Sequence, residues 1–210
     1  MIFSENILIC MALPLLLTVF LVKDKARRLV INFTLGMIIC LLSAYISGFI
    51  DVAFGNGTED TAIFLSPVVE EAMKFLPLLF YFLMFQPEDE QLFLAAVGLG
   101  AGFASFENVC SMITTGTESL TFLLIRGLAV GVMHIVSISA LALGLILTRH
   151  YKASETSTIL GALSIAMIFH GIYNLLASEP GLYSVIGFCL PPIIAFLVYL
   201  GYRQIEKTNR

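Results

Sequence analysis

Charged residues are scarce in this chain. Asp, Glu, Lys and Arg make up 12% of its 210 residues, whereas an average soluble domain has about 25%. Hydrophobic residues make up 59%, and the mean hydropathy is +0.96. Such a composition excludes an ordinary water-soluble domain, so we expect a membrane protein.

Other features are missing as well. There is no low-complexity tract, long linker or appended soluble domain, which leaves any chemistry in or beside the bilayer. The net charge of −4 argues against nucleic acid as a partner. The four cysteines have no paired spacing and are expected to be packing residues. No clear internal repeat is visible, which weakens the case for a transporter built from inverted halves.

Seven apolar runs are each long enough, or nearly so, to cross about 30 Å of hydrocarbon. They cover residues 6–22, 29–50, 62–85, 91–113, 121–147, 158–177 and 183–200. We therefore predict an all-α fold, a polytopic transmembrane bundle of about seven helices. Residues 1–210 are expected to form one membrane-embedded domain.

The lysines and arginines in the loops and the tail predict the orientation of the chain in the membrane. The first run is followed by a basic cluster: Lys23, Lys25, Arg27 and Arg28. This order is the reverse of a cleavable signal peptide, so the first helix is expected to be retained. The positive-inside rule places the cluster in the cytoplasm. With that orientation, the other loop and tail cations also lie in the cytoplasm: Arg149, Lys152, Arg203, Lys207 and Arg210. We expect a multi-pass protein of the cell (plasma) membrane, with its N-terminus outside and its C-terminus cytoplasmic.

Eight polar or ionisable residues lie inside the apolar runs. They are Glu70, Glu71, Lys74, Glu107, Arg126, His134, His170 and Asn174. A charged side chain at mid-bilayer costs about 2.5 to 3.5 kcal/mol, so these residues must face one another or water. At a rise of 1.5 Å per residue they lie about 6 to 20 Å from the outer ends of four helices. We therefore expect one polar site that is open to the outside.

Lys74 lies within one helical turn of two adjacent carboxylates, Glu70 and Glu71. This spacing allows the lysine to contact both of them. Two glutamates carry more charge than one lysine neutralises, which leaves one carboxylate as a candidate proton acceptor.

Glycines mark two helix faces. Gly98 and Gly102 have the spacing that permits close approach of a neighbouring helix. Gly127, Gly131 and His134 fall along one stripe of another helix. We expect both faces to be tightly packed.

The ionisable residues belong to four short motifs. In chain order these are Glu70-Glu71-x-x-Lys74, Phe103-Ala-Ser-Phe-Glu107-Asn108, Arg126 followed by His134, and His170-Gly-x-Tyr-Asn174. In this order and spacing they resemble the PrsW family of bacterial intramembrane proteases, over a core of about residues 66–176. That family is similar to the CAAX prenyl endopeptidases and the bacteriocin-processing membrane proteases. Glu107 stands where many of these relatives have histidine, and Asn174 where some PrsW proteins have aspartate.

Peptide hydrolysis requires an activated water, a group that stabilises the oxyanion and a proton donor to the leaving amine. All three are available among the eight residues. We expect Glu70 or Glu71 to be the general base, with Glu107 and His134 positioning the water or carrying the proton. His170 and Asn174 are expected to stabilise the oxyanion. Lys74 and Arg126 would support the site.

A covalent nucleophile is not expected, because no serine or cysteine lies in this set with a base at helical spacing.

A bound metal ion could activate the water instead of a glutamate. Zinc could be held by ligands from separate helices, namely Glu71, Glu107, His134 and His170. There is no His-Glu-x-x-His motif. A glutamate-activated water and a zinc-bound water both remain open.

Two other classes of function use similar residues. A proton-coupled transporter or channel would require a polar path through both halves of the bilayer, and a non-catalytic receptor would bind a membrane helix in the same groove. The resemblance favours the protease. It implies as substrate a membrane protein with a transmembrane segment, a single-span anti-sigma factor. The cut would be the first, site-one cleavage of a stress-signalling pathway.

Overall fold

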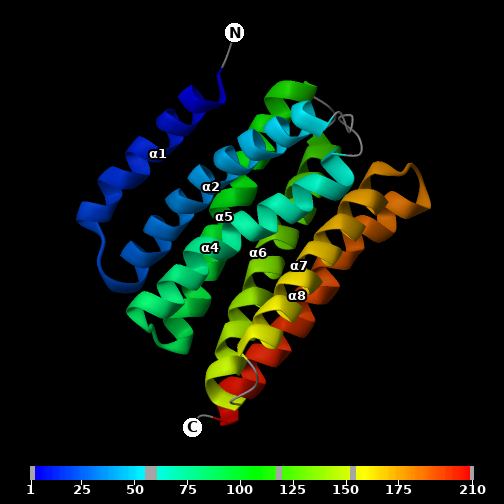
Figure 1. The fold of residues 1–210 in the computed structure, drawn as a ribbon. Helices are drawn as coiled ribbons and strands as arrows, with labels where there is room; N and C mark the ends of the chain where they lie inside the picture. Colours follow the sequence, from blue (N-terminus) through cyan, green and yellow to red (C-terminus); the bar gives the residue numbers. More distant parts are fainter. Residues whose placement is uncertain (1–2, 55–60, 117–119, 152–154, 209–210) are drawn as a thin grey trace.

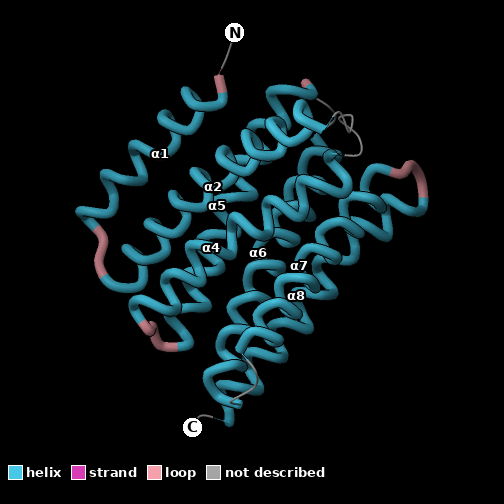
Figure 2. The backbone as a smooth tube through the Cα atoms, viewed as in Figure 1, coloured by secondary structure: helices cyan, strands magenta, loops and turns pink. Residues whose placement is uncertain are grey.

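The computed structural model describes residues 3–54, 61–116, 120–151 and 155–208, and these residues contain no β-strand. Its long helices are α1 (Ser4–Leu21), α2 (Asp24–Phe54), α4 (Ser66–Phe85), α5 (Asp89–Thr115), α6 (Leu120–Tyr151), α7 (Glu155–Ser178) and α8 (Leu182–Thr208). Successive helices run in alternating directions and lie side by side (Figures 1 and 2). The prediction of an all-α bundle of about seven helices is confirmed.

Six of these helices are long and apolar enough to cross a membrane: α1, α2, α5, α6, α7 and α8. The seventh, α4, has 20 residues and carries three ionisable side chains among them, Glu70, Glu71 and Lys74. Large apolar side chains such as Phe20 and Val52 point outward, as expected for surfaces in contact with lipid. The chain is a multi-pass membrane protein.

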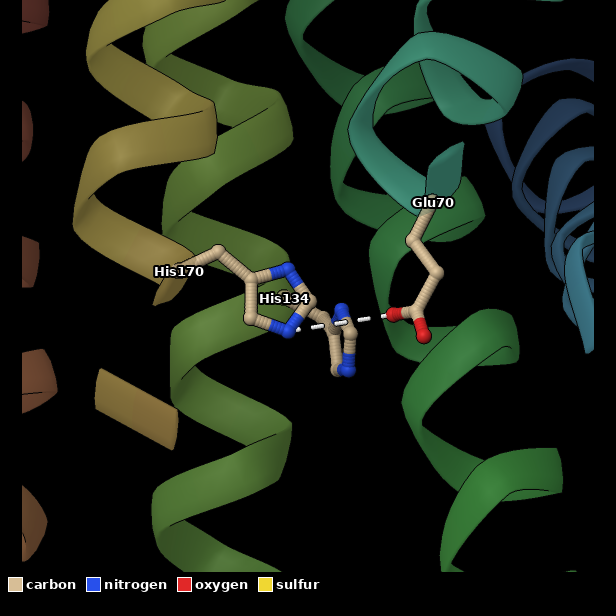
Figure 3. A group of neighbouring side chains, drawn as sticks. All are labelled: Glu70, His134 and His170. Carbon is tan, nitrogen blue, oxygen red and sulfur yellow. Dashed lines mark ion pairs between the residues drawn. The ribbon is translucent and has the colours of Figure 1, made fainter. Parts of the chain in front are cut away.

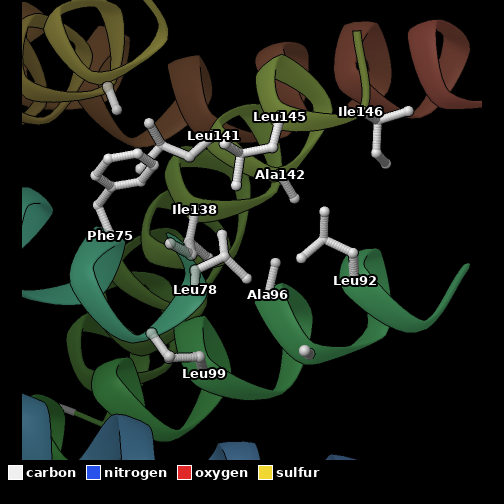
Figure 4. Packing of buried hydrophobic residues seen from close by; sticks show 12 residues of the cluster. Phe75, Leu78, Leu92, Ala96, Leu99, Ile138, Leu141, Ala142, Leu145 and Ile146 are labelled. Carbon is white, nitrogen blue, oxygen red and sulfur yellow. The ribbon is translucent and has the colours of Figure 1, made fainter. Parts of the chain in front are cut away.

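Helix α6 lies at the centre of the bundle, where it packs against α4, α5, α7 and α8. Helix α1 lies at the edge and packs on α2. The main hydrophobic core joins α4, α5 and α6 (Figure 4). Its buried side chains include Leu78, Leu92, Leu99, Ile138 and Leu145.

Helices α2 and α5 approach each other closely because glycines lie between them. A Cβ atom on Gly102 would lie 1.8 Å from the carbonyl oxygen of Phe33, and one on Gly36 would lie 2.1 Å from that of Leu99. A Cβ on Gly98 would lie 3.0 Å from the carbonyl oxygen of Leu29. The prediction that Gly98 and Gly102 pack closely is confirmed.

The same prediction was wrong for α6. A Cβ atom on Gly127 or Gly131 would meet nothing within 4 Å, although His134 on the same stripe is fully buried. The stripe therefore changes from open to sealed within two turns. This difference has a simple cause, since both glycines lie toward the α6 N-terminus, where the bundle opens into cavities.

The two ends of the bundle are held by different contacts. At one end, Lys25 pairs with Glu90, and Arg149 pairs with Asp89. At the other end, Thr61 donates a hydrogen bond to Asp51. The loop and tail cations that the structure describes lie at the end of the bundle that holds Lys25 and Arg149. This agrees with the predicted alternation of helix directions. Lys152 and Arg210 lie outside the described residues, as does the side chain of Lys207. That the first end is cytoplasmic stays a prediction.

Candidate active site

The start of α4 is fixed by contacts with two other helices. A π-helical segment, Thr61–Leu65, leads into α4. Thr61 donates a hydrogen bond of 2.6 Å to Asp51 of α2, and the Asn174 amide of α7 donates one of 3.1 Å to the carbonyl oxygen of Ala62. These bonds position the first turns of α4, and with them the two adjacent glutamates.

Glu71 and Lys74 are completely buried and form an ion pair, with Lys74 Nζ 2.6 Å from Glu71 Oε1. Lys74 Nζ also lies 3.0 Å from His134 Nδ1 and donates to Ser137 Oγ at 3.2 Å. The Ser137 hydroxyl donates in turn to Glu71 Oε1. We call these four residues the sealed network: Glu71, Lys74, His134 and Ser137. Burial of two charges without water requires such pairing, because an isolated buried ion is strongly unfavourable.

His170 connects the sealed network to Glu70. Its Nδ1 lies 2.8 Å from Glu71 Oε1. Its Nε2 lies 3.8 Å from Glu70 Oε2, a contact drawn in Figure 3. A carboxylate accepts a hydrogen bond, so the Nδ1 atom carries the proton in this contact. In the neutral imidazole the lone pair of Nε2 then faces Glu70.

A cavity of about 340 Å³ lies beside His170, and we call it the site cavity. Met133, Tyr173 and Phe188 form part of its apolar wall. Its lining also contains five of the eight predicted polar residues: Glu70, Glu107, Arg126, His170 and Asn174. The other three, Glu71, Lys74 and His134, do not line it and belong to the sealed network.

Glu107 touches both the site cavity and the sealed network. One of its carboxylate oxygens contacts His134 Nε2. The side chain of Glu107 is 32% exposed, whereas that of His134 is 0% exposed. Glu107 can therefore exchange protons with a molecule in the cavity, whereas His134 does not line the cavity.

Arg126 is held by an amide rather than by one of the glutamates. Its Nη1 atom donates a hydrogen bond of 3.1 Å to Asn108 Oδ1, and Asn108 Nδ2 donates to the carbonyl oxygen of Gly127. Arg126 and Phe122 line both the site cavity and a neighbouring hollow of about 360 Å³ between α5 and α6. Arg126 thus stands between two adjoining cavities.

Two features of the site were not predicted from the sequence. Lys74 was expected to contact both glutamates, but its described ion pair is with Glu71. Ser137 was missed entirely. It follows His134 by three residues and so shares its helix face, yet a serine in an apolar helix is too common to attract notice.

The residues fit a metal ion. Ligand atoms of Glu70, His134 and His170 lie within 4.8 Å of one another (Figure 3). One carboxylate and two imidazoles form a donor set suited to zinc and related divalent ions. Glu70 Oε2 is buried without a hydrogen-bond partner among the described residues, and Glu71 orients His170 as a carboxylate behind a metal-binding histidine does. Of the four ligands that the sequence had suggested, the group contains His134 and His170 but not Glu71 or Glu107, and it includes Glu70 instead.

Of the three candidate ligands, His134 is the least ready to bind a metal, because both of its ring nitrogens already have partners. Its Nδ1 faces Lys74 and its Nε2 contacts Glu107. A lysine ammonium can only donate, so in this arrangement the Nε2 atom carries the proton. His134 would have to exchange one of these contacts before it bound a metal.

A membrane bundle with carboxylates and histidines around a cavity of about 340 Å³ has the groups that a membrane-embedded hydrolase requires. The family comparison makes this specific. The chain belongs to the PrsW family of intramembrane metalloproteases, whose family model matches residues 25–201. The protein is therefore a membrane-embedded protease. The match extends beyond the core of residues 66–176 that carries the motifs. No protein of curated function and no solved structure matches the chain.

Proposed function

We propose that the protein hydrolyses a peptide bond of a membrane-anchored substrate and that the bond is cut in the site cavity. One observation carries this proposal. Glu70 lines the site cavity, and its buried Oε2 has no described hydrogen-bond partner and faces His170 Nε2. The adjacent Glu71 also has an unpartnered Oε2, but it does not line the cavity, and its Oε1 is engaged in the sealed network. A carboxylate kept free at the wall of a cavity is suited to binding a metal or water.

We assign the metal to Glu70, His170 and His134, and we propose zinc. A bound zinc ion would supply Lewis acidity toward water and toward the carbonyl oxygen of the substrate. Glu71 orients His170 so that its Nε2 faces Glu70, and His134 would join these two ligands by exchanging one of its contacts. Glu71 acts as a positioning residue, because it holds His170 through Nδ1.

Glu107 is the proposed general base and general acid. It accepts a proton from the attacking water as the oxygen–carbon bond forms at the scissile carbonyl. It then donates that proton to the leaving nitrogen as the carbon–nitrogen bond breaks, which gives a carboxylic acid and an amine. Its exposure to the site cavity and its contact with His134 support this assignment.

Asn174 and Arg126 are the proposed donors to the oxyanion. Both line the site cavity. The Asn174 amide uses one N–H for the carbonyl oxygen of Ala62 and has a second N–H on the same nitrogen. The predicted oxyanion role of His170 would require a proton on Nε2. The contact of Nδ1 with Glu71 favours the tautomer without that proton.

The proposed substrate is a single-span anti-sigma factor, cut first near its external side, as the family resemblance implies. The protein would lie in the plasma membrane with its N-terminus outside. In support, the lining of the site cavity includes residues near the starts of α4 and α6 and near the end of α7, whereas Arg27 and Arg28 lie at the start of α2 and Arg149 at the end of α6. Because successive helices alternate in direction, these arginines lie toward the opposite end of the bundle. With the proposed orientation, a substrate would reach the site cavity from the outer half of the bilayer.

Co-expression with a single-span reporter tests the proposed function. We expect the intact protein to cut the reporter, and Glu70→Gln and Glu107→Gln to leave it uncut at equal expression. Glu90→Gln is the matched control, because Glu90 is an exposed carboxylate that pairs with Lys25 at the other end. Undiminished cleavage by Glu70→Gln would contradict the proposal. Proton transport in liposomes without any cleavage would favour a transporter.

A further inference from the structure

A second cavity lies at the end of the bundle away from the site cavity. It has a volume of about 570 Å³ and lies between the first turns of α2 and the second half of α4. None of its lining residues lines the site cavity. We call it the α2–α4 cavity.

The lining of the α2–α4 cavity changes from charged to apolar along α2. Arg27 and Arg28 lie in the first turns, and Ile31 and Leu35 follow one and two turns deeper. From Arg28 to Leu35 the helix rises about 10 Å. Phe80 of α4 lines the same cavity and is largely exposed, so the cavity is open toward the lipid. A charged head and an apolar tail would match this gradient.

The two arginines are placed to bind an anion. Arg27 Nε donates to the carbonyl oxygens of Val19 and Val22, both at 3.0 Å, which holds the guanidinium beside the end of α1. These bonds use Nε alone, and the two terminal amino groups of a guanidinium carry four further N–H donors. Arg28 is half-buried in the cavity wall. Both arginines line the same cavity, and a guanidinium group suits a phosphate, which it can bind through two parallel hydrogen bonds.

The charge of this region favours an anionic ligand over a zwitterionic one. The lining contains two arginines and one acidic residue, Asp24. By contrast, Arg149 at the same end is paired with Asp89 and donates to the carbonyl oxygen of Pro87. Basic pockets between membrane helices are a recurrent site for anionic lipid headgroups.

We propose that the α2–α4 cavity binds an anionic phospholipid of the bilayer. The lipid phosphate contacts Arg27 and Arg28, and an acyl chain lies along Ile31, Leu35 and Phe80. The site is separate from the catalytic one, so the proposal does not depend on the proposed cleavage mechanism.

Lipid binding to the purified full-length protein in uncharged detergent micelles tests the proposal. Native mass spectrometry would count bound phosphatidylglycerol and phosphatidylcholine. We expect one phosphatidylglycerol to bind more tightly than phosphatidylcholine, and Arg27→Gln/Arg28→Gln to weaken it roughly tenfold. Arg203→Gln is the matched control, because Arg203 is exposed near the same end and does not line the cavity. We expect this control to leave binding unchanged.

A second variant guards against misfolding of the double mutant. Ile31→Trp adds bulk at an exposed position of the lining without changing the charge, and we expect it to weaken phosphatidylglycerol binding as well. Inorganic phosphate at millimolar concentration should not displace the lipid. Equal binding of the two lipids, an equal effect of Arg203→Gln, or displacement by inorganic phosphate would overturn the proposal.

Discussion

Glu70 and Glu71 are adjacent in the sequence but belong to two different regions of the protein. Glu71 lies in the sealed network, where Lys74, Ser137 and His170 surround it and its side chain is 0% exposed. Glu70 lies at the wall of the site cavity, and its Oε2 atom has no described hydrogen-bond partner. One step along a helix turns a side chain by about 100°, which is enough to separate the two environments.

The difference between these regions indicates a division of work. The cavity wall presents groups that can reach a substrate, a metal or water. The sealed network fixes the positions of those groups, since Glu71 orients His170 and His134 contacts Glu107. Substitutions at the wall should therefore affect chemistry first, and substitutions of Lys74 and Ser137 in the network should affect stability first. His134 belongs to the network and is also a proposed metal ligand, so its substitution should affect both.

The largest effect is expected from Glu70→Gln. The amide removes the charge of a proposed metal ligand, so we expect loss of bound zinc and of all detectable cleavage. With zinc removed from both proteins, the free energy of unfolding should be close to that of the unchanged protein, because Glu70 makes no described ion pair shorter than 3.8 Å. Zinc content, cleavage and unfolding would be measured on the same preparation. If the variant retained its zinc, Glu70 would not be a zinc ligand.

Glu107→Gln should separate the metal from the chemistry. A glutamine cannot accept the proton of water, and loss of a general base typically lowers the rate about 10²- to 10⁴-fold. Zinc content should remain unchanged, since Glu107 is not one of the three proposed ligands. Single-turnover cleavage and zinc content are the measurements. A variant that lost its zinc as well would show that Glu107 is a ligand.

Lys74→Met probes the sealed network. It leaves the Glu71 carboxylate buried without its cation, and breaking a buried pair in this way typically costs about 3 to 5 kcal/mol of unfolding free energy. Adding Glu71→Gln should restore part of the loss. Lys25→Met is the matched control, because its pair with Glu90 is exposed and should not change stability measurably. Equal stability of the Lys74 and Lys25 variants would contradict the sealed network.

Asn174→Ala is expected to have the smallest effect of the four. It removes a proposed oxyanion donor, and loss of one such donor lowers the turnover rate about 10²-fold. It also removes a hydrogen bond to the carbonyl oxygen of Ala62, which contributes about 0.5 to 1.5 kcal/mol to stability. The Michaelis constant should change little. A change confined to the Michaelis constant would assign Asn174 to substrate binding.

Much of the fold followed from the sequence because hydrocarbon thickness sets the length of a membrane helix. The apolar run of residues 29–50 became α2, Asp24–Phe54, which extends past it at both ends. Charged and polar residues can continue a helix beyond the hydrocarbon, so hydropathy marks the span more accurately than the ends. The close approach at Gly102 was predictable for a related reason, since small residues are what close helix contacts require.

The division between Glu70 and Glu71 was not predictable. Both lie within one turn of Lys74, so helical spacing alone allows either glutamate to form an ion pair with it. The choice depends on Ser137 and His170, which other helices bring to Glu71. The same limit explains the error at Gly131, because a glycine stripe does not show whether another helix covers it.

Cleavage of a single-span substrate by purified Glu70→Gln protein tests the central claim most directly. The turnover rate per folded molecule would be compared with that of the unchanged protein and of Glu90→Gln, in the same lipid and with added zinc. The account predicts a folded Glu70→Gln protein without detectable product, beside full activity of Glu90→Gln. Product formation by Glu70→Gln at the rate of the unchanged protein would contradict it.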